Sequence, residues 1–239
     1  MAVEILTKHV QESLVALYLR LNGFYTSGHI LHASAENLAI REKGDIDVFA
    51  IRLPFSQEPE TGVPPSQYLS IENGILEIII GEVKSGEEKI QFNPSIRNPQ
   101  NMLRALRRAG FSNNDKVLSG IADKLTDLMK PQIVNQPENH IEIFLEKSDS
   151  IHHPIRIRPI LFHLGCKQPD KNQTWFVGYE EIMSDIWKRL RKEFQPDTCQ
   201  RDYDLHLWGP VLDSIVDYFK SENRSEPGTP EELVHKLLG

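Results

Sequence analysis

The run "ILEIIIGEVKSG" at residues 75–86 constrains the fold more than any other part of the 239-residue sequence. Its consecutive β-branched residues are typical of a strand that is buried on both faces. Such a strand needs a layer of structure on each side, so the chain is predicted to form an α/β or mixed α+β layered domain. The run ends with Glu82 and Lys84, which are two residues apart and therefore point to the same side of the strand.

Apolar periodicity predicts further helices and strands around this run. A first helix is predicted over residues 3–21, and its apolar residues cover most of its surface, so Glu12 should point into protein. Residues 28–44 favour extended structure, and the proline-rich segment 55–67 is typical of an exposed loop. Strands are predicted at "DIDVFAIRLP", "HIEIFLE", "IRIRPILFHLG" and "TWFVGY". Helices are predicted at about 98–110, 114–130, 210–221 and 230–238, and another follows "TWFVGY" and ends near Phe194.

Length and composition allow one large domain, or one domain with a small appendage. From the predicted elements, we expect one domain over residues 1–194 and a helical extension over 195–239. No apolar stretch reaches the roughly 20 residues that span a bilayer, and the amphipathic N-terminus is unlike a signal peptide, so a cytoplasmic protein is expected. Cys166 and Cys199 allow one disulfide, but reduced thiols are the preferred interpretation. The net charge of −7 means that nucleic-acid binding would require a local patch of Lys and Arg.

Acidic residues stand at the ends of two predicted strands. Asp45 and Asp47 share one face of their strand, and Glu82 shares a face with Lys84. If the strands are neighbours, Asp47 and Glu82 can converge, and their charges repel unless a cation lies between them or one takes a proton. Carboxylate oxygens suit Mg²⁺, which can polarise a phosphoryl oxygen and activate water. A nearby Lys can orient that water or stabilise transition-state charge, so the set predicts a phosphodiester-cleaving site.

The strings "GDIDVFAI" and "IIIGEVKS", behind the helix "VQESLVALYLRLNGFYT", resemble the PD-(D/E)XK nuclease superfamily, closest to archaeal Holliday-junction resolvases and Mrr-type restriction enzymes. The resemblance covers roughly residues 4–110. It implies a restriction-endonuclease-like core, in which helices flank a central mixed sheet. The C-terminal helices predicted from the apolar pattern are additional to this core. The resemblance also implies a site for Mg²⁺, or Mn²⁺ as a substitute, in which the ligands are Asp47, Glu82 and the Val83 carbonyl, Lys84 positions the attacking water, and Glu12 supports the metal.

Two features differ from the superfamily pattern. Ile46 stands before Asp47 where Pro is usual, and Asp47 and Glu82 are 35 residues apart, a long separation that the proline-rich segment accounts for. Asp45 competes with Asp47 for the ligand role or supports the site, and it can also be an ordinary turn residue. The Asp-x-x-Ala context favours Asp47.

Purely structural interpretations compete for the same residues. Glu82 and Lys84 can form a solvated pair at the end of a strand, and Glu12 can form an i,i+4 ion pair with Lys8. Either pair alone is common in proteins that have no activity. The nuclease interpretation depends on four side chains meeting around one divalent ion, namely Glu12, Asp47, Glu82 and Lys84.

The predicted helix over residues 98–110 carries a basic face directly after the site. Gln100, Arg104 and Arg107 form one stripe, and Arg108 lies beside it. Such a face could hold DNA phosphates, and in the resembling superfamily a polar residue on this helix often supports the site, for which Gln100 is the candidate. An ordinary solvated helix face explains the same residues equally well.

The leading hypothesis is a Mg²⁺-dependent endonuclease that hydrolyses phosphodiester bonds with metal-activated water, in DNA rather than RNA, as a homodimer or with a partner subunit. One alternative is a catalytically silent module of the same fold that binds nucleic acid or a protein. Another is a subunit that is active only in a complex, as in defence or recombination systems. The sequence does not specify the preferred DNA structure or sequence.

Overall fold

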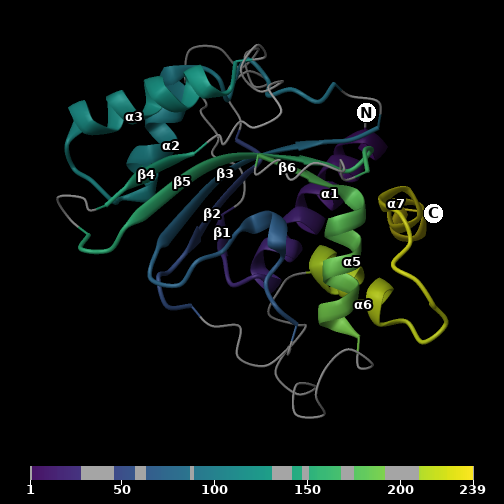
Figure 1. Ribbon diagram of the computed structural model, residues 1–239. Coiled ribbons are helices and arrows are strands. Elements are labelled where there is room, and N and C mark those ends of the chain that lie inside the picture. The colour runs from purple at the N-terminus through teal and green to yellow at the C-terminus, as the bar shows by residue number, and fades with distance from the viewer. Residues whose placement is uncertain are drawn as a thin grey trace.

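The computed structural model describes residues 2–27, 46–56, 63–86, 89–130, 142–146, 151–167, 175–191 and 210–238. These residues form an α/β fold in which helices flank a six-stranded mixed sheet (Figure 1). The strands are β1 (Tyr25–Ser27), β2 (Val48–Arg52), β3 (Leu76–Lys84), β4 (Ile143–Leu145), β5 (Ile155–His163) and β6 (Phe176–Gly178).

The sheet has the order β1-β2-β3-β5-β4, and β6 also pairs with β5. β2 pairs in antiparallel register with both β1 and β3, whereas β3 and β5 run parallel over nine residue pairs. β4 is antiparallel to β5, and β6 is parallel to it. A parallel connection needs a long crossover, and the helices α2 (Pro99–Ala109) and α3 (Asp115–Leu128) lie within the crossover from β3 to β5.

The other described helices lie across the sheet from α2 and α3 (Figure 1). They pack on one another, with α1 in contact with α5, α6 and α7. None of the described helices is long and apolar enough to cross a membrane. These helices are α1 (Ala2–Leu21), α5 (Tyr179–Leu190), α6 (Pro210–Lys220) and α7 (Pro230–Leu238).

The isoleucine run of β3 is buried on both faces, as the sequence predicts. Ile78 and Ile80 belong to the hydrophobic cluster under α2 and α3, whereas Ile79 belongs to the cluster that α1, α5, α6 and α7 cover. Side chains alternate along a strand, so Glu82 and Lys84 continue the face of Ile78 and Ile80 at the end of β3. The two cores fix β3 tightly and leave its last residues to carry polar side chains.

Several predicted element boundaries are confirmed. Asn98 caps α2 by accepting a hydrogen bond from the backbone N–H of Gln100, and Gly110 ends the helix at φ 69°. Asn114 caps α3, and Thr229 forms a capping box with Glu232 at the start of α7. The short strand β1 was not predicted, and the extended segment 28–44, residues 57–62 of the proline-rich segment and the boundary at residue 194 lie outside the described residues.

An arginine–glutamate network lies at the opposite end of β3 from Lys84. The fully buried carboxylate of Glu77 accepts hydrogen bonds from Arg156 Nε at 3.0 and 3.1 Å and from Arg158 Nη2 at 3.2 Å. The same Arg156 reaches the more exposed Glu72 at 2.6 Å. Because Arg156 and Arg158 are on β5, the network ties the two parallel strands together.

Candidate active site

Asp47 and Glu82 face each other at neighbouring strand ends. β2 begins at Val48, which pairs with Gly81 in antiparallel register, so the preceding residue, Asp47, lies opposite Glu82. Asp47 Oδ2 accepts a hydrogen bond from the backbone N–H of Val83 at 2.9 Å. Both carboxylates are buried, which holds them against the sheet rather than in solvent.

Lys84 and Asn93 hold the carboxylate of Glu82. Glu82 Oε1 lies 3.2 Å from Lys84 Nζ, and Glu82 Oε2 accepts a hydrogen bond from the backbone N–H of Asn93 at 2.8 Å. Lys84 Nζ also donates to Asn93 Oδ1 at 2.5 Å. The three residues therefore form a closed ring of contacts between the end of β3 and the loop before α2. Lys84 is buried as well, so this is not the solvated pair that the structural alternative supposed.

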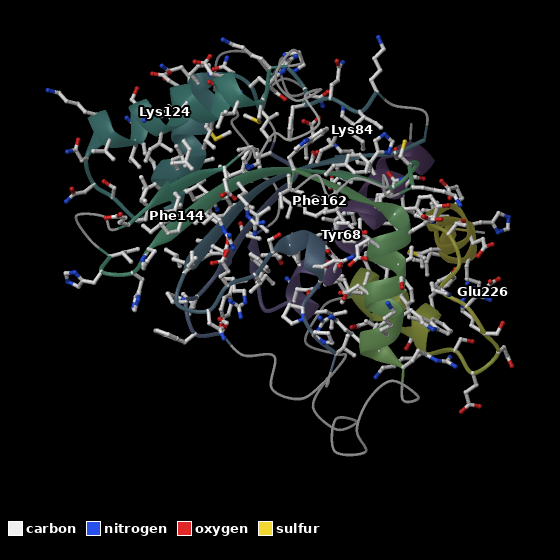
Figure 2. The ribbon with its side chains drawn as sticks, viewed as in Figure 1. Tyr68, Lys84, Lys124, Phe144, Phe162 and Glu226 are labelled. Carbon is white, nitrogen blue, oxygen red and sulfur yellow. The ribbon has the colours of Figure 1, made fainter. Side chains whose placement is uncertain are left out.

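Lys8 connects Glu12 of α1 to Asp47. The ammonium of Lys8 lies 3.5 Å from Glu12 Oε1 and 3.3 Å from Asp47 Oδ1. The i,i+4 ion pair expected within α1 is therefore present, but it also reaches the sheet. Glu12 is buried, as its place on a covered helix predicts. Figure 2 labels Lys84 at the end of β3 on the side of the molecule that holds the start of α1.

The charges of this site shift two pKa values. Burial raises the pKa of Glu82 and the nearby charge of Asp47 adds to the rise, while the N–H of Asn93 and the ammonium of Lys84 oppose it. Partial burial disfavours the charge on Lys8, but the carboxylates of Asp47 and Glu12 outweigh this and raise the pKa of Lys8. The effect of Asp47 on Glu82 places the two carboxylates within electrostatic reach of each other.

Gln100 does not join the site. Its side chain is exposed at the start of α2, and among the described residues it makes no hydrogen bond to Glu82 or Lys84. The contact that supports these two residues comes instead from Asn93, in the loop that leads to α2. Asp45, the competing ligand, lies outside the described residues.

The predicted basic residues of α2 are exposed on the helix that covers the same face of the sheet as the site. Arg107 forms a two-point ion pair with Asp115 of α3, at 3.0 and 3.1 Å. Arg104 lies 3.4 Å from Asn101 Oδ1, and Arg108 is exposed. Part of the basic face is therefore engaged with α3.

The sequence hypothesis missed two site residues, Asn93 and Lys8. A weak signal for Asn93 is the Asn93-Pro94 pair, which is typical of a turn that returns the chain toward the strand it leaves. For Lys8 the signal was its spacing to Glu12, which was interpreted as local to the helix. Neither spacing could indicate contact with Asp47 or Glu82.

The donor set around β2 and β3 fits a magnesium ion with few protein ligands. Within the described residues no group of three His, Cys, Asp or Glu side chains is arranged to hold a metal ion. Mg²⁺, however, is usually bound through one or two carboxylates and keeps several waters. Apart from its ion pair with Lys84, the buried Glu82 Oε1 has no hydrogen-bond partner in the described structure. A buried acceptor with unused capacity opposite a second carboxylate suits a divalent cation.

Comparison of the chain with protein-family models, with curated proteins and with solved structures gives no match.

Proposed function

We propose that the protein is a divalent-metal-dependent nuclease of the PD-(D/E)XK type that hydrolyses phosphodiester bonds in DNA. The observation that carries the proposal is the opposition of two buried carboxylates, Asp47 and Glu82, directly beside the buried ammonium of Lys84. Burying like charges together is costly, and a site that binds a cation and a phosphate explains why the fold tolerates it.

The arrangement of elements supports a restriction-endonuclease-like core. A long helix precedes three antiparallel strands, and after two further helices a strand returns parallel to β3. Of the proposed metal ligands, Asp47 directly precedes the second of these strands, and Glu82 and Val83 lie on the third. Glu12 lies on the first helix. This is the order of elements that the resemblance implies.

Each residue of the site has a distinct role in the proposed reaction. Asp47, Glu82 and the carbonyl of Val83 would hold the metal ion, which when bound polarises a phosphoryl oxygen and lowers the pKa of water. The ammonium of Lys84, fixed by Glu82 and Asn93, would donate hydrogen bonds to the attacking water or to the charge that develops on phosphate. Asn93 is a positioning residue, because it acts on both side chains through hydrogen bonds.

The substrate is proposed to be DNA because exposed arginines lie on the same side of the sheet as the site. Arg104, Arg107 and Arg108 are exposed on α2, and Arg97 Nε donates to the carbonyl of Asn93 at 3.4 Å. Arg97 is thus linked through Asn93 to Glu82 and Lys84. Arginine is well suited to bind phosphate by paired N–H groups, and such a local patch is needed in a chain whose net charge is −7.

Nicking of supercoiled plasmid tests the proposal. The wild type should nick in Mg²⁺ or Mn²⁺ and not in EDTA, and Asp47→Asn and Lys84→Met should each lose about 100-fold or more in rate. Lys124→Met on α3 is the matched control, because Lys124 is exposed and lies apart from Lys84 (Figure 2). Cleavage that survives both site substitutions contradicts the proposal. Metal-independent binding without cleavage favours the silent module, and activity that returns only in lysate favours a subunit.

A further inference from the structure

We propose that the ammonium of Lys8 serves as the resident cation of the metal-free site and is displaced when a divalent ion binds. The inference rests on the proposed metal site. It assigns to Lys8 a role that the sequence pattern does not indicate, because the i,i+4 spacing to Glu12 suggests only a local helix pair.

The geometry places Lys8 on the oxygen of Asp47 that a metal would use. Asp47 Oδ2 is held by the N–H of Val83 at 2.9 Å, whereas Oδ1 lies 3.3 Å from Lys8 Nζ. The same ammonium lies 3.5 Å from Glu12 Oε1. Lys8 therefore bridges a carboxylate of the helix and a carboxylate of the sheet, as a bound cation would.

The burial of the three groups shows which of them can move. The side chains of Glu12 and Asp47 are only 8% and 9% exposed, whereas that of Lys8 is 57% exposed. The carboxylates are thus fixed in the wall of the site, and the lysine reaches them from the solvent side. Its flexible four-carbon chain can withdraw by rotation into water, where an ammonium is strongly hydrated.

Lys84 provides the contrast within the same site. Its side chain is 7% exposed and is held by both Glu82 and Asn93. Two lysines therefore contact the three carboxylates of the site: Lys84 is fixed, and Lys8 is able to leave. A divalent ion bound to Asp47 would lie within a few ångströms of the Lys8 ammonium, and the two positive charges would repel each other. Lys8 should therefore leave Asp47 when the ion binds.

Titration of the metal-free protein with Mn²⁺, followed by calorimetry, tests this competition. Lys8→Met should bind Mn²⁺ at least about fivefold more tightly than the wild type, the lower end of typical coupling between two ligands. In EDTA, the melting temperature of Lys8→Met should be lower than that of the wild type, and Mn²⁺ should restore it. Lys124→Met controls for the change in net charge and should leave the affinity unchanged, and Asp47→Asn should abolish binding.

Amine labelling of the wild type gives a second readout that needs no variant. Mn²⁺ should increase the acylation rate of Lys8 several-fold relative to Lys124, because an amino group released from its contacts with Asp47 and Glu12 is more accessible to the reagent. If Lys8→Met binds Mn²⁺ equally or more weakly, or if labelling of Lys8 is unchanged at saturating Mn²⁺, the inference is overturned and the proposed metal site stands. If neither the wild type nor Lys8→Met binds Mn²⁺, the proposed metal site itself fails.

Discussion

Replacing Glu77 by Gln should destabilise the protein strongly, although the residue is far from the candidate active site. Glu77 is the fully buried carboxylate that accepts hydrogen bonds from Arg156 and Arg158. The substitution keeps the shape of the side chain but removes its charge and sets an amide NH₂ group against guanidinium donors. Two buried positive charges would then lack their shared counter-ion.

The size of the effect follows from the burial of all three partners. Arg158 and Glu77 have side chains that are 1% and 0% exposed, and Arg156 is 7% exposed. Removing one partner of a buried ion pair typically costs about 3–5 kcal/mol. In a chain of this size each kcal/mol lowers the melting temperature by roughly 2–4 °C, so a fall of roughly 6–20 °C is expected.

Glu72→Gln provides a control that uses the same arginine. Glu72 pairs with Arg156 at 2.6 Å, but its side chain is 60% exposed, so its loss should cost about 0–1 kcal/mol. The free energy of unfolding of both variants can be measured by urea denaturation at neutral pH, monitored by circular dichroism. Equal destabilisation by the two substitutions would refute the argument that burial, rather than the presence of an ion pair, sets the cost.

Three further predictions concern the supporting loop, the carboxylate of Glu82 and the cap of α3. Asn93→Ala should lower the nicking rate about 10- to 100-fold with a smaller effect on Mn²⁺ affinity, measured by single-turnover cleavage and calorimetry; an unchanged rate would show that Asn93 does not position Lys84. Because burial raises the pKa of Glu82, the folded state binds that proton more tightly than the unfolded chain, and the stability it contributes is present at low pH and lost as the pH rises through the folded pKa. Glu82→Gln removes this titration, so in EDTA its melting temperature relative to that of the wild type should be higher at pH 8 than at pH 5. The opposite trend would contradict the direction of the pKa shift. Asn114→Ala should cost about 1 kcal/mol through loss of the α3 cap, and no change in a urea melt would count against that cap.

The elements of the fold were predictable because their signals are local. The consecutive isoleucines at 78–80 indicate a doubly buried strand, and Asn98 with Gly110 indicates both ends of α2. The convergence of Asp47 and Glu82 could also be proposed, because two neighbouring strands with acids at adjoining ends leave few alternatives. Whether the two strands pair depends on the tertiary structure, so the sequence could predict the convergence only for the case that the strands are neighbours.

The contacts that complete the site were not predictable, because they depend on how elements distant in sequence are placed. Lys8 reaches Asp47 only because the first turns of α1 lie close to the start of β2. Asn93 reaches Glu82 and Lys84 because the loop after β3 turns back on the strand before α2 begins. Gln100 differs in the same way: the sequence hypothesis places the supporting amide on the helix, whereas in the described structure the loop residue Asn93 contacts Glu82 and Lys84.

The most direct test of the central claim is the position of Mn²⁺ in crystals of the wild-type protein, located by anomalous scattering. The proposal predicts one strong peak in contact with the carboxylates of both Asp47 and Glu82, at roughly 2.0–2.2 Å, close to the distances at which Mg²⁺ binds oxygen. Absence of a peak between these two carboxylates at saturating Mn²⁺, or a peak bound only to surface residues elsewhere, would contradict it.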